Sequence, residues 1–210
     1  TGVAVILLGG WLANGPDSVY PDNRFNPDSA RAYFVRRPLE VFARALEIGG
    51  RSAGFCVGLL ADYLGGELET AADARAIALA ELLTALGPTF IKAGQSASIR
   101  TDLLPPAYIR GLTSLQDQVP AFATDDARAI IEDELGGAPG AAALVRSLGD
   151  APVAAASLGQ VYRGRLEDGT EVALKVQRPG IVRTIALDMV LIRDVVAPLA
   201  SAFGLPGDLV

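Results

Sequence analysis

Residues 151–180 read APVAAASLGQVYRGRLEDGTEVALKVQRPG, and this stretch decides the fold. Residues 160–166 alternate and are rich in Val, Tyr and Arg, which is typical of a strand. Residues 167–169 supply an Asp-Gly turn, and residues 170–176 alternate again. The pattern predicts two strands, a tight turn and a third strand.

Two features set this hairpin apart from an ordinary one. Lys175 stands in VALK, an apolar strand segment where a plain sheet would place another hydrophobic side chain. Upstream, AAASLGQV is similar to the protein-kinase loop pattern GxGxxGxV. Ala154 and Ala156 replace its first two glycines, whereas Gly159 and Val161 are retained. Lys175 lies sixteen positions after Gly159, a spacing that suits a hairpin that carries a nucleotide between loop and lysine.

The chemistry of phosphate binding needs these residue types in this order. A loop between two strands places backbone N–H groups over phosphates, and a lysine on the next strand adds a point charge. Val161 and Ala173 would form a small apolar roof over an adenine, because alanine is short enough to admit the ring. Alanine in place of glycine disfavours close backbone approach, so we expect a stiffer loop. The alternative is an ordinary hairpin whose lysine reaches past the sheet into water.

A second stretch, residues 86–122, reads LGPTFIKAGQSASIRTDLLPPAYIRGLTSLQDQVPAF. It resembles the KxGQ segment of the UbiB family of atypical protein-kinase-like proteins, which act in prenylquinone metabolism. The resemblance rests on KAGQ at residues 92–95, SIRTDLLP at 98–105 and LQDQVP at 115–120. The alanine-rich loop at 154–157 and VQRPGI at 176–181 extend it. It covers the chain from about residue 26 onward, and residues 25–48 look most like the cyanobacterial and plastid branch.

The resemblance implies an α+β fold: a helical extension that carries the KxGQ helix, then the start of a kinase-like small lobe with an antiparallel sheet. It also implies that Lys92 and Gln95, with Gly94 between them, face the nucleotide site rather than solvent. Lys175 would be the catalytic phosphate lysine. The remaining residues expected to bind ATP or ADP are Ala154, Ala155, Ala156, Ser157, Gly159, Val161 and Ala173.

The implied function is an ATP-binding atypical kinase or ATPase that supports prenylquinone metabolism at a membrane, with proteins of that pathway as partners. The implied location is a chloroplast plastoglobule or thylakoid, with a mitochondrial or bacterial inner membrane as alternatives. We expect the chain to be a piece of a longer protein whose Mg²⁺ ligands and remaining catalytic groups lie beyond residue 210, so this piece alone should not be catalytic. A non-catalytic nucleotide-binding regulator and a membrane-associated scaffold stay open as alternatives.

Composition narrows these classes. Half of the 210 residues are hydrophobic, 20% are charged, and mean hydropathy is +0.34, which indicates missing packing partners or a membrane surface. The net charge of −6 argues against nucleic acid as a partner. Histidine is absent, so imidazole bases and histidine-bound metals are excluded from this chain. The single cysteine, Cys56, rules out an internal disulfide, and its apolar neighbours predict a buried thiol.

The chain order suggests three parts: an apolar segment and linker at residues 1–27, the helical KxGQ extension at 28–147, and a partial kinase-like lobe at 148–210. Residues 1–13 are apolar but short of the ~20 residues that span a bilayer, so they are expected to end a longer hydrophobic segment or to lie at an interface. Arg31, Arg36 and Arg37 form a basic cluster that fits a solvated helix face or anionic lipid.

Helix boundaries follow from proline, glycine and capping residues. We expect one helix from Pro38 that is weakened or broken at residues 49–54, and another capped by Thr70. Further helices are expected at 88–98 and 105–116, and another from Thr124 to the glycines at 136–137. The last is expected at 181–203 with a kink at Pro198.

Overall fold

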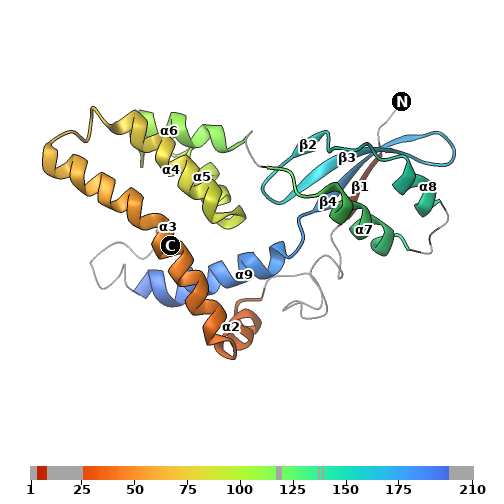
Figure 1. The fold of residues 1–210 in the computed structure, drawn as a ribbon, viewed down its shortest axis with the longest axis horizontal. Coiled ribbons are helices and arrows are strands. Elements are labelled where there is room, and N and C mark those ends of the chain that lie inside the picture. Colours follow the sequence, from red (N-terminus) through yellow and green to blue (C-terminus); the bar gives the residue numbers. More distant parts are fainter. Residues whose placement is uncertain (1–3, 9–25, 117–119, 137, 139, 199–210) are drawn as a thin grey trace. The chain divides into compact units, whose positions relative to one another are not determined.

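The computed structural model describes residues 4–8, 26–116, 120–136, 138 and 140–198. The chain divides into two compact units whose relative positions are not determined (Figure 1). The sheet unit contains residues 1–23 and 117–182, and the helical unit contains residues 24–116 and 183–210. The predicted α+β class, with helices ahead of a small antiparallel sheet, is confirmed.

The sheet unit is built on the predicted hairpin. β2 (Ala154–Ala155), β3 (Gly159–Arg165) and β4 (Glu171–Gln177) are antiparallel neighbours. The turn between β3 and β4 closes with a hydrogen bond from the Leu166 N–H to the Thr170 carbonyl, 2.9 Å long. Gly169 takes the left-handed conformation there, at φ 84°, which glycine adopts without steric cost. The Thr170 N–H donates to the Asp168 carboxylate and lowers the pKa of that group.

A fourth strand, β1 (Ala4–Leu8), pairs with the free edge of β4 in parallel, so the strand order is β1-β4-β3-β2. Sequence analysis expected these residues to belong to a separate apolar segment. The structure instead places them in the sheet, where the backbone of these five residues pairs with the otherwise unpaired edge of β4. The rest of the expected segment and its linker, residues 1–3 and 9–25, lie outside the described residues.

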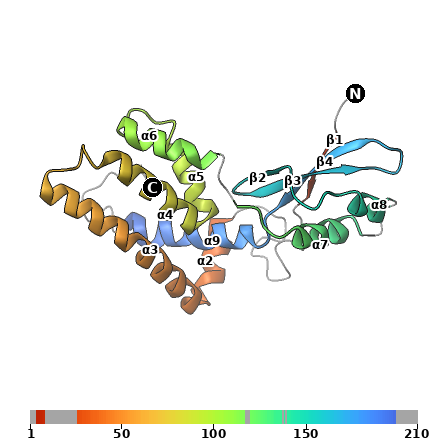
Figure 2. The same cartoon turned by 45° about the horizontal axis from the view of Figure 1, so that its top comes forward.

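Two helices cover one face of the sheet. α7 (Thr124–Glu134) and α8 (Ala141–Arg146) lie along this face in both views (Figures 1 and 2). The core between helices and sheet is mainly apolar, but it includes the Tyr162 hydroxyl, to which the buried side chain of Gln160 is bonded. Its buried residues are Ala127, Ile130, Ile131, Leu144, Val145, Leu148, Tyr162, Val172, Leu174 and Val176.

The helical unit contains α2 (Pro27–Val35), α3 (Pro38–Gly65), α4 (Ala72–Leu86), α5 (Pro88–Ala97), α6 (Pro106–Thr113) and the 3₁₀ turn η1 (Ser114–Gln116). Most of α9 (Ile181–Leu191) and the π-helical turn η2 (Ile192–Val196) also belong to it. Because α7 and α8 pack on the sheet and α9 lies mostly with the other helices, these units do not follow the predicted boundaries at residues 27/28 and 147/148.

Two local predictions about helices were wrong. α3 runs unbroken through Gly49, Gly50 and Gly54, because Arg44 before the glycines and Asp62 after them are bonded to other elements of this unit. Thr70 does not cap α4, since its hydroxyl donates to the Glu67 carbonyl and the helix begins at Ala72 without a side-chain cap.

Cys56 is exposed rather than buried, and Ala53, Val57 and Leu60, which lie on the same side of α3, are exposed as well. The last expected helix also differs from its prediction. α9 changes into the π-helical turn at Ile192–Val196, ahead of Pro198, and residues 199–203 lie outside the described part.

Candidate functional site

The strand register brings four predicted site residues to one face of the sheet. Ala154 lies directly opposite Val161, and Val161 lies opposite Lys175, so these three form a row across the strands. Ala173 lies two residues from Lys175 along β4 and therefore shares its face. Residues opposite each other in antiparallel strands point to the same side, so the row is a continuous patch.

This face is open, whereas the other face carries the core. Val161 and Ala173 are half-buried and Lys175 is exposed, while Val172, Leu174 and Val176 alternate with them and are buried. Within the described residues, the side chain of Lys175 makes no hydrogen bond or ion pair. An unpaired ammonium group on an otherwise small and apolar patch is available for an anion.

The alanine-rich loop is a tight turn beside this row. The Ala156 N–H donates to the Gly159 carbonyl over 2.7 Å, and the Gly159 N–H donates back over 3.3 Å. At the two positions between them, Ser157 and Leu158, the described residues provide no acceptor for the backbone N–H. Leu158 is exposed, so its free N–H is suited to a phosphate oxygen, whereas Ser157 is buried as a whole residue and its N–H is not open to a ligand in this conformation.

Two residues of the turn have specific steric roles. A Cβ at Gly159 would collide with the Val176 carbonyl, so only glycine lets β3 approach β4 this closely. Ser157 is 1% exposed, and its hydroxyl has no hydrogen-bond partner in the described part of the chain. Neither its hydroxyl nor its backbone is therefore open to solvent, and the turn offers the backbone of Leu158 instead.

A shallow hollow of about 330 Å³ lies on the sheet near Ala173. The ion pair between Arg163 and Glu171, with a closest N–O distance of 2.6 Å, borders it, and hydrogen bonding by Arg163 lowers the pKa of Glu171. Its lining residues are Val153, Tyr162, Arg163, Glu171, Val172 and Ala173. The hollow has the size of a small-molecule site but includes only Ala173 of the predicted nucleotide residues.

The KxGQ helix is α5, in the helical unit. Lys92 is exposed and donates to the Gln95 side-chain oxygen over 3.0 Å, and the Gln95 amide donates to the Leu115 carbonyl over 2.8 Å. Gly94 is buried, and a Cβ there would lie 2.5 Å from the Leu115 side chain and 2.7 Å from that of Leu83. The motif therefore ties α5 to the turn η1.

Whether Lys92 and Gln95 face the nucleotide site stays a prediction. They belong to the helical unit and Lys175 to the sheet unit, and the relative positions of the units are not determined. Without a bound phosphate or a partner carboxylate, a lysine is expected to reach solvent or a nearby acid, because burying an unpaired ammonium group is costly. Lys92 does reach solvent.

The helical unit contains a buried ionic cluster that sequence analysis missed. Asp188 on α9 is completely buried and accepts hydrogen bonds from Arg44 on α3, at 2.8 and 3.2 Å. It also accepts one from the Thr89 hydroxyl on α5, at 2.6 Å. The only signal in the sequence is an aspartate within the apolar run TIALDMVLI.

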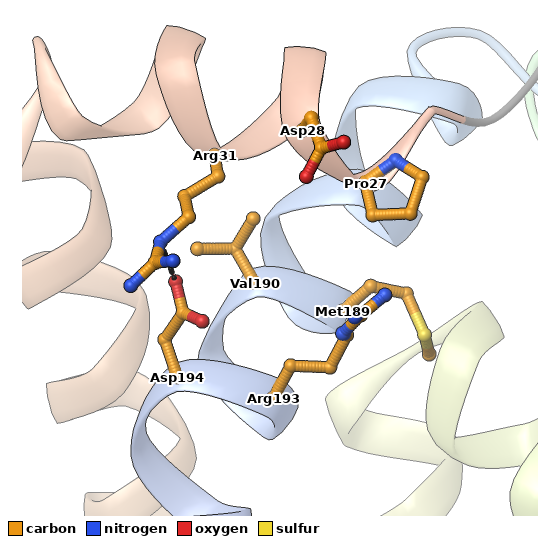
Figure 3. Close-up of a pocket in the computed structure, with 7 residues that line it drawn as sticks. All are labelled: Pro27, Asp28, Arg31, Met189, Val190, Arg193 and Asp194. Carbon is orange, nitrogen blue, oxygen red and sulfur yellow. Dashed lines mark ion pairs between the residues drawn. The ribbon is translucent and has the colours of Figure 1, made fainter.

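Two neighbouring hollows of this unit were also missed. A groove of about 580 Å³ has a mainly apolar lining from α2, α3, α9 and η2, namely Phe34, Val35, Pro38, Val41, Phe42, Ala45, Val190, Leu191, Asp194 and Val195. Beside it, a smaller pocket of about 60 Å³ includes Arg31, Arg193 and Asp194 (Figure 3).

Two of the three predicted basic-cluster residues form ion pairs. Arg31 pairs with Asp194 over 3.1 Å, and Arg37 pairs with Glu40 over 3.8 Å while its guanidinium lies 3.7 Å from the centre of the Tyr33 ring. These ion pairs neutralise two of the three positive charges that were expected to contact solvent or anionic lipid.

The described residues contain neither a metal-binding cluster nor a membrane-spanning helix. No group of three or more His, Cys, Asp or Glu side chains is placed to hold a metal ion. Among the described helices, none is both long and apolar enough to cross a membrane.

Comparison with known proteins decides the family. Residues 114–205 match the model of the ABC1 atypical kinase-like domain. The chain is 46% identical over 182 residues to the uncharacterized protein sll0005 of Synechocystis sp., covering 86% of this chain and 26% of that protein. It is 44% identical over 172 residues to the chloroplastic protein ACTIVITY OF BC1 COMPLEX KINASE 3 of Arabidopsis thaliana, covering 81% and 24% of the two chains.

Residues 114–205 therefore belong to the ABC1 atypical kinase-like family, and chloroplastic and cyanobacterial proteins are homologues of the chain. The resemblance to the UbiB family, in its cyanobacterial and plastid branch, is thereby confirmed. The chain is also 41% identical over 178 residues to a chloroplastic aarF domain-containing protein kinase of Arabidopsis thaliana, covering 84% of this chain and 25% of that protein. It spans about a quarter of the length of these relatives. No solved structure matches it.

Proposed function

We propose that the intact protein binds ATP or ADP on the open face of the sheet and acts as an atypical kinase or ATPase. One observation carries this proposal: Ala154, Val161 and Lys175 form a row beside a turn whose exposed tip has a free backbone N–H. Lys175 would supply charge to the phosphates and the turn would supply hydrogen bonds, while Val161 and Ala173 would contact the base.

Phosphoryl transfer needs a metal ion as well as these groups, because catalysis depends on positioning and on neutralising phosphate charge. Mg²⁺ would neutralise that charge. Since the described residues hold no carboxylate cluster and the relatives are more than three times as long as this chain, we assign the Mg²⁺ ligands to other parts of the intact protein.

We further propose that the protein supports prenylquinone metabolism at a chloroplast membrane surface, a plastoglobule or thylakoid, together with proteins of that pathway. Two observations support this setting. Several relatives are chloroplastic Arabidopsis proteins. α3 also carries an exposed row of large apolar side chains, which we call the α3 apolar face: Leu39, Phe42, Leu46, Val57, Leu60, Tyr63 and Leu64.

A second candidate function is a nucleotide-binding regulator with little or no turnover. The closed geometry of the turn favours it, because Ala156 and Gly159 are bonded to each other and Ser157 is buried. Measuring ATP hydrolysis by the intact protein with Mg²⁺ separates the two: turnover that disappears in Lys175→Ala supports the enzyme, and nucleotide binding without turnover supports the regulator.

The binding proposal is tested by Lys175→Ala in the intact protein, using calorimetry with ATP and with ADP. Loss of one charge-assisted contact should weaken binding about 10- to 100-fold. Since Lys175 is exposed and unpaired in the described part, the unfolding free energy should not change. Arg165→Ala is the matched control, because it removes an exposed positive charge from the same hairpin at the end away from the alanine-rich turn. Equal affinity in Lys175→Ala and the unmodified protein would disprove the proposal.

A further inference from the structure

A buried glutamine in the sheet unit binds the chain segment that enters this unit. Gln160 on β3 is 0% exposed. Its side-chain oxygen accepts the Phe122 N–H at 3.0 Å, and its amide donates to the Phe122 carbonyl at 3.2 Å. The same amide also donates to the Tyr162 hydroxyl. The carboxamide thus pairs with Phe122 in both directions, as a neighbouring strand would, and it keeps the buried polar groups satisfied.

Arg178, directly after β4, holds the same segment from a second side. Its guanidinium donates to the Pro120 carbonyl at 2.7 Å and lies 5.3 Å from the centre of the Phe122 ring. Burial lowers the pKa of this guanidinium. Residues 120–122 are therefore fixed by two side chains from different places in the hairpin, and we call these four contacts the linker clamp.

Both residues of the linker clamp are also bonded to the alanine-rich turn. Gln160 follows Gly159, the last residue of the turn, and pairs through its backbone with Ala155. The Arg178 N–H donates to the Leu158 carbonyl at 2.9 Å. The turn and residues 120–122 are therefore joined through the same two residues.

We propose that Gln160 and Arg178 are positioning residues, which hold the alanine-rich turn in its phosphate-binding position by anchoring it to residues 120–122. This inference rests on the proposed nucleotide function. Residues 120–122 lead into α7, which packs on the core, so the anchor is itself supported by the apolar core of the unit. A turn that leaves its competent position lowers apparent affinity in proportion to the time it spends elsewhere.

The test uses Gln160→Met and Arg178→Met in the intact protein, with Arg178→Lys as the conservative variant. Gln160→Met keeps the length of the side chain but removes its hydrogen bonds, and Arg178→Lys keeps a donor for the Pro120 carbonyl. We expect faster hydrogen exchange at the Phe122 N–H in Gln160→Met, because its acceptor is gone. We expect about tenfold weaker ATP binding in both methionine variants and nearly unchanged binding in Arg178→Lys.

Failure of this inference is distinguishable from failure of the proposed function. Unchanged Phe122 exchange in Gln160→Met would overturn the linker clamp, whatever the nucleotide does. Unchanged ATP affinity in both methionine variants, in a protein whose Lys175→Ala variant has lost binding, would overturn the positioning role and leave the nucleotide site standing. Arg178 is only half-buried, so its variant answers the question even if Gln160→Met does not fold.

Discussion

Lys175 owes its place on the open face to the alternation of β4. Val172, Leu174 and Val176 turn into the core, so the residue between the last two turns out. The same rule places Gln160 on the core side, one residue before Val161, where its amide meets the Phe122 backbone. Adjacent residues of one strand thus serve two purposes, because one face can offer a ligand site while the other anchors the chain.

Substitution of Ala156 tests how the flexibility of the turn affects the preference between ATP and ADP. Ala156→Gly should loosen the turn and permit closer approach of its N–H groups to phosphates, since glycine carries no Cβ. We expect the ratio of ATP to ADP affinity, measured by calorimetry on the intact protein, to change. The unfolding free energy should change little by comparison. Ala155→Gly, within β2, is the control, because Ala155 was predicted to bind the nucleotide but lies opposite the buried Gln160 and so faces the core side of the sheet. An unchanged ratio would contradict this role of the alanine.

Asp102 gives a prediction about pH within the SIRTDLLP motif. The side chain of Arg100 donates two hydrogen bonds to its carboxylate, at 2.8 and 2.9 Å, and lowers the pKa of Asp102 to about 2. A lowered pKa means that the contact stabilises the fold above the ordinary aspartate pKa of 3.8 and is lost as the pH falls toward about 2. NMR titration of Asp102 should show this value, and Arg100→Ala should return it toward 3.8. A normal pKa in the unmodified protein would show that the pair does not persist in solution.

Of the structural elements, the hairpin could be predicted from the sequence, whereas the packing of helices around a buried ion pair could not. The hairpin was predictable because strand alternation and an Asp-Gly turn are local signals. The Asp188 cluster was not, because it needs three helices from distant parts of the chain. α8 was missed because its six residues, AAALVR, follow a glycine-rich stretch and carry too short a pattern. The row of Ala154, Val161 and Lys175 could not be predicted either, because it depends on the strand register, which the spacing of residues alone does not determine.

The Asp188 cluster should dominate the stability of the helical unit. Asp188→Leu leaves the Arg44 guanidinium in place, which is nearly buried, and should cost about 3–5 kcal/mol of unfolding free energy. Adding Arg44→Met to that variant should recover part of the loss, because two apolar side chains then replace the ion pair.

Urea unfolding of the intact protein measures both effects. Asp194→Leu is the matched control, since Asp194 pairs with an Arg31 side chain that is 66% exposed, and such pairs contribute at most about 1 kcal/mol. Equal losses in Asp188→Leu and Asp194→Leu would show that burial of the cluster does not matter.

The high apolar content of the chain leaves large apolar side chains exposed, and many of them lie on α3. Arg44 and Asp62 are bonded to α9 and α4, respectively, so the inward side of α3 is ionic. The residues of the α3 apolar face are 56% to 81% exposed instead. Helical spacing puts them together on the side opposite Arg44 and Asp62. Cys56 was expected to be buried because an apolar run normally indicates a core, whereas this helix is apolar on its outer side.

If the α3 apolar face binds lipid, removing it should abolish membrane association without unfolding the protein. In Leu46→Gln/Leu60→Gln, helix propensity is nearly conserved and both positions are exposed, so the unfolding free energy should stay within about 0.5 kcal/mol. Each leucine transferred from water contributes about 1.5–3 kcal/mol, so binding to neutral phosphatidylcholine vesicles should fall at least tenfold. Salt should have little effect, because the chain is acidic overall and Arg31 and Arg37 are already paired. Leu103→Gln, at an exposed leucine outside α3, is the control. Vesicle binding that survives the double substitution, or that needs anionic lipid and low salt, would assign membrane association to another surface.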